Sequence, residues 1–163
     1  MVLAELKFKN ITIEPEPYDK VQDLFIEYIR SCFRIEKHKC FKQIPTDLSK
    51  DEPDLVIELT AYKKKKVFAI SSFFNGTQES FIFRWEYLKA FRQYDKKISG
   101  KSYFIIGYGG TPDKPEKLYI LPLSLFKKDT AVYLKDLKRN CIKVNNKGEF
   151  RYDVLDDTLL LLK

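Results

Sequence analysis

Residues 53–74, Pro-Asp-Leu-Val-Ile-Glu-Leu-Thr-Ala-Tyr-Lys-Lys-Lys-Lys-Val-Phe-Ala-Ile-Ser-Ser-Phe-Phe, are the stretch of sequence that decides the fold. Two runs rich in apolar and β-branched residues flank four consecutive lysines. This pattern predicts an antiparallel β-hairpin over residues 54–62 and 67–74. Asp54 follows a proline and stands at the start of the first predicted strand, so an acidic side chain is expected at one end of the hairpin.

Length and charge limit what the chain can be. At 163 residues it is long enough for one domain with its own core, and we expect a single domain over residues 1–163. Thirty basic and 23 acidic side chains give a net charge of +7, with a pI near 9.2. An excess of this size suits a polyanion such as DNA or RNA as a partner. The alternative is a lysine-rich surface that only keeps the protein soluble.

The sequence offers no sign of a membrane or an oxidising compartment. No window reaches the roughly 18 apolar residues of a membrane-spanning helix, and the first ten residues lack the apolar run of a signal peptide. The three cysteines are widely spaced, which argues against a disulfide framework, so we expect a cytoplasmic protein. His38 and Cys40 lack a second ligand pair at a spacing suited to zinc.

Helical periodicity is clearest before the hairpin. Asp19 and Gln22 have the spacing of a capping box. Apolar residues then recur at helical spacing, and they are Val21, Leu24, Phe25, Tyr28, Ile29, Cys32 and Phe33. This pattern predicts a helix, followed by a loop over residues 34–52.

After the hairpin, Phe81, Trp85, Leu88 and Phe91 predict a second helix that begins near Ser80 and ends before Gly100. The apolar run at 102–108 predicts a central, doubly covered strand. A further strand is expected at 118–123. For residues 127–163 the pattern predicts a short helix starting at Thr130 and then a hairpin that pairs 142–144 with 150–152.

The order of these segments resembles the PD-(D/E)xK, or restriction-endonuclease-like, superfamily of nucleases. The resemblance covers about residues 19–126, and it includes a strand, Gly-Gly-x-Pro turn and strand over residues 105–112 and 115–123. It implies an α/β fold, a restriction-endonuclease-like mixed sheet flanked by helices in a single domain.

The resemblance also implies a catalytic motif. In active members, the aspartate of Pro-Asp and the glutamate of Glu-x-Lys hold Mg²⁺, and the lysine orients the attacking water. Asp54 matches the aspartate and is the predicted metal ligand, whereas Ser71 stands at the glutamate position and Phe73 at the lysine position. Neither replacement supplies charge, so we expect a degenerate, catalytically inactive nuclease fold, a pseudoenzyme that needs no cofactor.

The alternative is an active Mg²⁺-dependent endonuclease of a defence or mobile-element type with a relocated carboxylate. Glu86 and Lys89 on the second predicted helix would then complete a catalytic set with Asp54, because some relatives move the glutamate to this helix. Against this hypothesis, Glu86 and Lys89 are also spaced as an ordinary surface pair.

The partner hypothesis rests on lysines, which contact phosphates without reading sequence. The predicted nucleic-acid-binding residues are Lys63, Lys64, Lys65, Lys66 and Lys101, with Lys114 and Lys117 nearby. A degenerate member would bind DNA or RNA, or serve as a structural subunit with a protein partner or as a homodimer.

Overall fold

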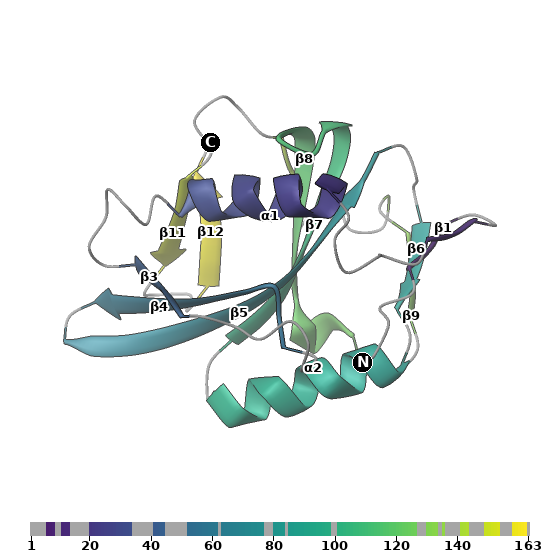
Figure 1. The fold of residues 1–163 in the computed structure, drawn as a ribbon. Coiled ribbons are helices and arrows are strands. Elements are labelled where there is room, and N and C mark those ends of the chain that lie inside the picture. The colour runs from purple at the N-terminus through teal and green to yellow at the C-terminus, as the bar shows by residue number, and fades with distance from the viewer. Residues whose placement is uncertain are drawn as a thin grey trace.

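The computed structural model describes residues 6–8, 11–13, 20–33, 41–44, 52–61, 63–76, 80–83, 85–98, 101–126, 130–133, 135, 141–143, 149–153 and 158–162. Its central element is a six-stranded sheet (Figure 1). The strands of this sheet are β3 (Phe41–Ile44), β4 (Leu55–Ala61), β5 (Lys64–Asn75), β7 (Lys101–Thr111), β8 (Lys114–Pro122) and β10 (Cys141–Lys143). The helices are α1 (Lys20–Cys32), α2 (Trp85–Ile98) and a short 3-10 turn, η2 (Leu123–Leu125).

The strand order in the sheet is β10-β8-β7-β5-β4-β3. Strands β3, β4 and β5 form an antiparallel meander, and α2 then carries the chain across so that β7 runs parallel to β5. Strand β7 lies inside the sheet between β5 and β8, and residues 102–107 are all buried. The predicted fold class, a restriction-endonuclease-like mixed sheet flanked by helices, is therefore confirmed.

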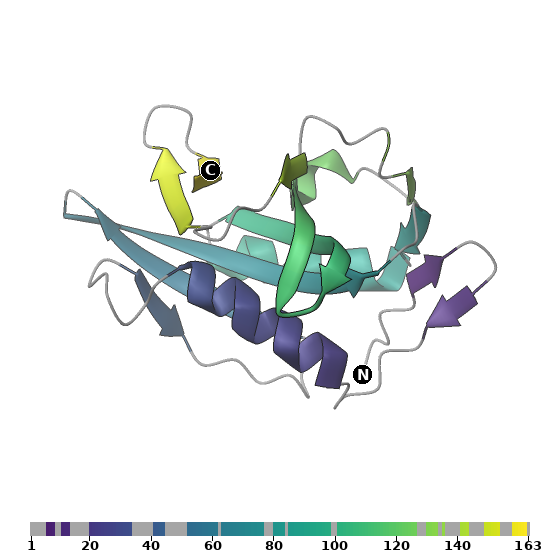
Figure 2. The ribbon, with the colours of Figure 1, turned by 90° about the horizontal axis from the view of Figure 1, so that it is seen from above.

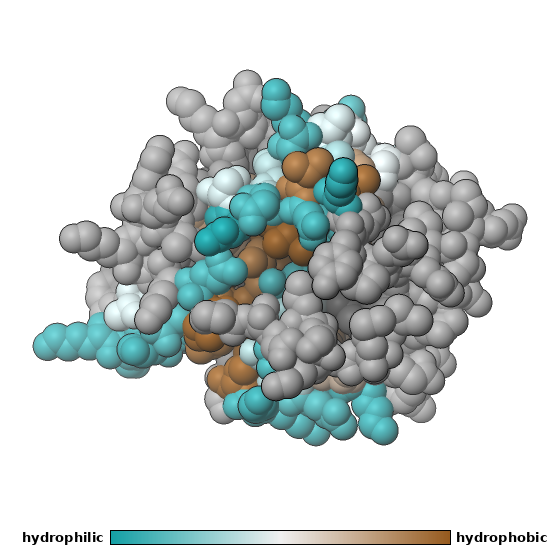
Figure 3. Space-filling model, viewed as in Figure 1, coloured by the Kyte–Doolittle hydropathy of each residue, from teal (hydrophilic) through white to brown (hydrophobic). Residues whose placement is uncertain are grey.

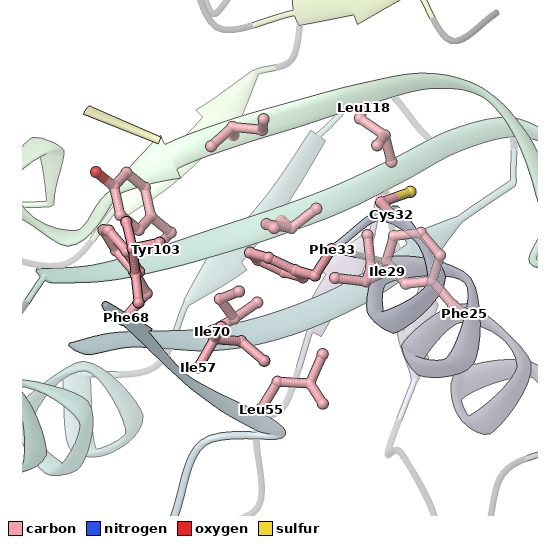
Figure 4. Packing of buried hydrophobic residues seen from close by; sticks show 13 residues of the cluster. Phe25, Ile29, Cys32, Phe33, Leu55, Ile57, Phe68, Ile70, Tyr103 and Leu118 are labelled. Atoms are coloured by element: carbon pink, nitrogen blue, oxygen red, sulfur yellow. The ribbon is translucent and has the colours of Figure 1, made fainter. Parts of the chain in front are cut away.

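The two helices cover opposite faces of the sheet (Figures 1 and 2). On the face of α1, Phe25, Ile29 and Phe33 pack against odd-numbered residues of β4 and even-numbered residues of β5, such as Ile57 and Ile70 (Figure 4). On the face of α2, Leu88 and Phe91 pack against Ala69, Phe73 and Phe104. The alternation of side chains along β5 thus assigns each of its residues to one of two cores.

The pairing of the remaining strands differs from the predicted one. Strand β6 (Ser80–Phe83) pairs with β9 (Thr130–Tyr133), so the second helix begins only at Trp85 and the helix predicted to start at Thr130 is wrong there. Aromatic and β-branched residues in both segments suit strands, and the backbone of each segment pairs with the other.

The predicted C-terminal hairpin is also wrong. Strand β10 pairs with residues 117–119 of β8, whereas β11 (Glu149–Asp153) pairs with β12 (Thr158–Leu162). Strand β3 lies within the predicted loop over 34–52 and forms one edge of the sheet. At the N-terminus, β1 (Leu6–Phe8) and β2 (Ile11–Ile13) pair with each other.

Helix α1 has the predicted extent but a narrower buried stripe. Phe25, Ile29 and Cys32 are buried, which confirms Cys32 as a packing residue, whereas Val21 and Leu24 are 43% and 51% exposed. Consecutive residues of an α-helix are about 100° apart, so Leu24 lies off the line that Phe25 and Ile29 define. Within the described part of the chain, no helix is long and apolar enough to cross a membrane.

Candidate functional site: a capped aspartate at the end of the hairpin

Asp54 lies in the bend just before β4 and is bound to the neighbouring strand. The backbone N–H of Ser72 donates to Oδ2 of Asp54 at 2.7 Å, and the Ser72 hydroxyl donates to the same oxygen at 3.2 Å. Ser72 is fully buried, whereas Asp54 keeps some exposure. The backbone pairing between β4 and β5 ends at Leu55 and Ile70, so it does not extend to the N–H of Ser72. The side chain of Asp54 accepts that N–H instead.

Gln22, in the first turn of α1, binds the next backbone groups of β5. Its amide nitrogen donates to the Ser72 carbonyl, and its amide oxygen accepts the N–H of Phe74 at 3.4 Å. The side chains of Asp54 and Gln22 therefore bind the backbone groups of β5 that lie beyond the end of β4. Both ends of the Gln22 amide are used by the sheet, and the capping box stays a prediction. The other member, Asp19, lies outside the described residues.

Helix α1 can approach β5 and β7 closely because residue 107 is glycine. A Cβ at Gly107 would lie 2.6 Å from the ring of Phe25 and 3.0 Å from the ring of Phe74. The Phe25 and Phe74 rings are themselves in contact, with centroids 5.8 Å apart. A larger residue at 107 would push α1 outward, and with it Gln22.

Burial governs the ionisation of Asp54. Desolvation of the carboxyl group raises the pKa of Asp54 from 3.8 to about 6, and the two hydrogen bonds from Ser72 offset part of this rise. The negative charge of Asp23 raises the pKa of Asp54 a little further, which places this exposed helix residue within electrostatic reach of the site. Asp23 was missed in the sequence, where it was only one more polar residue of an amphipathic helix.

The structure brings Ser72, rather than Ser71, to Asp54. Phe74 and Ser72 lie on the α1 side of β5, whereas Phe73 belongs to the core under α2, with Ser71 on the same side by alternation. The residues of β5 nearest Asp54 are thus one position later than the resemblance implied. Ser72 and Phe74 are the same residue types as Ser71 and Phe73, so this shift by one position supplies neither the carboxylate nor the lysine of the motif.

The helix that carries Glu86 and Lys89 lies on the other face of the sheet (Figure 1), and the relocated set stays a prediction. Asp54 bonds to the α1 side of β5, whereas Glu86 and Lys89 belong to α2 on the opposite face. Lys89 is exposed, and the side chain of Glu86 lies outside the described part. Glu27, a further acidic residue of α1, is exposed and pairs with Arg30 at 3.5 Å. Of the acidic side chains that the structure describes, that of Asp23 has a charge that acts on Asp54.

The lysines occupy the other end of the same hairpin. Lys64, Lys65 and Lys66 are not a loop, because they belong to β5 and pair with residues 59–61. Lys63 forms the turn with a positive φ of 63°. Lys63, Lys64 and Lys65 are exposed, and Nζ of Lys65 lies 3.3 Å from Oε1 of Glu58. Lys101 begins β7 opposite Phe68, two residues beyond the lysines of β5.

Comparison with known proteins adds little to this geometry. No protein-family model matches the chain, and no curated protein matches it. Among solved structures, the chain is similar to Hjc from Archaeoglobus fulgidus, described as a Holliday junction resolvase from an archaeal hyperthermophile. That match has a TM-score of 0.48 at 13% identity and covers 74% of this chain and 93% of the other. The strand order described above assigns the fold class.

The chemistry available at Asp54 is limited. Mg²⁺ prefers several oxygen ligands in near-octahedral geometry, with carboxylates as the charged ones. Here Ser72 and Gln22 are engaged with Asp54 and the β5 backbone, which leaves Asp54 and the exposed Asp23. Within the described residues there is no group of three or more His, Cys, Asp or Glu side chains placed to hold a metal ion. These residues do not fit a hydrolytic magnesium site.

Proposed function

We propose that this protein is a nuclease-fold pseudoenzyme that binds nucleic acid through its lysine hairpin and does not hydrolyse phosphodiester bonds at Asp54. The observation that carries the proposal is the set of groups around Asp54. Asp54 is contacted by the hydroxyl and the backbone N–H of Ser72, and the Gln22 amide binds the next backbone groups of β5. None of these groups can activate a water or neutralise a phosphate.

Metal-assisted phosphodiester hydrolysis needs charge at both the attacking and the leaving oxygen. Asp54 and Asp23 add negative charge only. The nearest β5 side chain beyond Ser72 on that face is Phe74, which packs on Phe25 and has no polar group. The site therefore supports closure of the sheet edge better than catalysis.

The binding half of the proposal is supported by the lysine end of the hairpin. Three lysines are exposed at this end of the hairpin, which extends beyond the part of the sheet that α1 covers (Figure 2). Their charges are partly offset by one described acidic neighbour, Glu58. A flexible row of ammonium groups contacts phosphates without base recognition, so the expected binding is independent of sequence and sensitive to salt.

Cleavage and binding can be tested separately. Plasmid and single-stranded DNA are incubated with the protein in Mg²⁺ and in Mn²⁺, alongside the Asp54→Asn variant. We expect no difference in product between the two proteins. Cleavage that disappears in Asp54→Asn would overturn the proposal and support the active endonuclease with a relocated carboxylate.

If such cleavage occurred, Asp23 and Glu86 would be the two carboxylates to compare. Loss of activity in Asp23→Asn would place the active site on the α1 side of the sheet. Loss in Glu86→Gln would support the set with Lys89 instead. Binding is measured independently by the change in affinity when Lys63 to Lys66 are all replaced by glutamine.

A further inference from the structure

A second group of lysines lies on the outer face of α2. The helix turns Leu88 and Phe91 to the sheet, and it exposes Lys89, Lys96 and Lys97. Lys89 and Lys96 are seven residues apart, two turns on the same side of the helix, with a separation of roughly 10 Å along its axis. The acidic residue Asp95 is turned inward, since its Oδ1 accepts the Ser102 hydroxyl at 2.7 Å.

This helix face and Lys65 of the lysine hairpin lie on the same side of the sheet. Lys65 lies on the α2 side of β5 by alternation with Ala69 and Phe73. The C-terminal end of α2 is followed closely by Lys101, which pairs beside Phe68 near the start of β5. In the view of Figure 3, hydrophilic residues gather along the hairpin tip and along the lower edge, where α2 lies in Figure 1.

We infer that the outer face of α2, with Lys89, Lys96 and Lys97, continues the lysine hairpin as one surface that takes the phosphate backbone of a nucleic-acid duplex. The inference rests on the proposed function and adds the place of binding and the form of the partner. Three ammonium groups on a rigid helix can meet phosphates whose positions are fixed, as they are in a duplex.

A single strand is the less suitable occupant. Proteins that hold single strands without sequence preference stack bases on exposed aromatic rings. The large apolar side chains exposed in the described part are Val21, Leu24 and Leu125, none of which is aromatic. Among the described side chains of α2, Tyr94 lies beside these lysines and is partly buried, with Nζ of Lys97 6.0 Å from its ring centroid.

The hairpin end of this surface is remote from Asp54, and its α2 part lies on the other face of the sheet (Figure 1). Asp54 meets β5 on the α1 side, and the seven residues of β4 separate it from the lysine end by roughly 20 Å. A duplex on α2 therefore leaves the aspartate uncovered. Binding is expected to be the same in the protein and in the Asp54→Asn variant.

The test uses fluorescence anisotropy with a labelled 20-base-pair DNA duplex between 50 and 200 mM salt. The α2 variant carries Lys89→Gln, Lys96→Gln and Lys97→Gln. The matched control carries Lys20→Gln, Arg30→Gln and Lys135→Gln, which remove the same charge from exposed positions outside the proposed surface. Thermal unfolding checks that all variants are folded.

Each phosphate contact contributes about 0.9 to the slope of log affinity against log salt for duplex DNA. The α2 variant is expected to lose roughly 2 to 3 from this slope and at least about tenfold in affinity at 100 mM salt. The control is expected to change affinity by less than about threefold, through long-range charge alone.

The outcomes separate the two proposals. If the hairpin variant weakens binding and the α2 variant behaves like the control, the α2 surface is wrong while the proposed function stands. If the unaltered protein does not bind at 50 mM salt, the binding half of the proposed function fails. If a single strand of equal length binds more than about tenfold tighter than the duplex, or an acidic polypeptide competes equally well, the duplex assignment is overturned.

Discussion

The two ends of the β4–β5 hairpin differ in whether their polar groups are bound within the protein or exposed to solvent. At one end, Asp54 and Gln22 bind the β5 backbone, so the donors and acceptors of Ser72 and Phe74 are used by the protein itself. At the other end, Lys63, Lys64 and Lys65 are exposed, and one described ion pair, between Lys65 and Glu58, engages them. The same two strands thus carry one end whose polar groups are hydrogen-bonded within the protein and one end whose charged groups are exposed.

This difference between the two ends affects which charged groups are available to a ligand. A buried charge must be hydrogen-bonded to be tolerated, and once it is, its oxygens are less available to a ligand. Exposed ammonium groups keep their hydration and can exchange it for phosphates at little cost to folding. In the proposed function, the position that the resemblance marks for catalysis therefore serves the scaffold, and the lysine end of the hairpin serves the partner.

The largest expected effect distinguishes the two sides of β5. Phe73→Lys would put an ammonium group into the core under α2, where Phe73 is 6% exposed and its ring centroid lies 6.1 Å from that of Phe104. We expect a loss of about 4 kcal/mol or more in the free energy of unfolding, measured with urea. Phe74→Lys, on the half-buried α1 side, is expected to cost less. A larger loss of unfolding free energy for Phe74→Lys than for Phe73→Lys would contradict the placement of Ser72 and Phe74 on the Asp54 side of β5.

The next effect concerns the buried charge. Because the pKa of Asp54 is about 6 in the folded protein and 3.8 is its ordinary value, the folded state binds the proton more tightly. The resulting stabilisation is fully present below about pH 4 and is lost as the pH rises through 6. Relative to Asp54→Asn, the protein should lose at most about 3 kcal/mol between pH 4 and pH 8.

Urea unfolding of both proteins at several pH values measures this difference, and other titrating groups cancel in the comparison. A constant difference across this range would show that Asp54 is not desolvated. The Asp23→Asn variant sharpens the test, because it should lower the pKa of Asp54 and make the difference smaller.

A smaller effect is expected from removing the amide of Gln22, which binds the backbone of β5 beyond the end of β4. Gln22→Ala leaves the Phe74 N–H and the Ser72 carbonyl without their side-chain partner, and we expect a loss of about 1 to 2 kcal/mol in unfolding free energy. Gln93→Ala is the matched control, an exposed glutamine on α2. Equal stability of the two variants would mean that the amide contributes nothing to the sheet.

The smallest effect lies at the lysine end. Lys63 has a φ of 63°, a left-handed conformation that glycine adopts without steric cost. Lys63→Gly is therefore expected to stabilise the protein by up to about 1 kcal/mol, seen as a rise in Tm. Lys64→Gly, within β5, should lower it. A fall in Tm for both variants would argue against the tight turn at Lys63.

The sequence by itself determined the elements whose signal is local. The alternation in residues 53–74, the helical spacing over 20–33 and the apolar run at 102–108 each need only neighbours along the chain, and all three segments have the predicted structure. Asp54 was also found locally, from its place after a proline at the start of a strand. The prediction that Ser71 and Phe73 stand at the catalytic positions remains an assignment by resemblance.

Tertiary structure decided the pairings and the surroundings of Asp54. Segments such as β6 and β9, nearly fifty residues apart, are short apolar runs whose pattern fits a strand or a helix, and only contact between them selects the strand. Gln22 and Ser72 are likewise fifty residues apart. Their hydrogen bond exists because α1 packs close to β5 over Gly107, and side-chain spacing along one segment carries no information about such a contact.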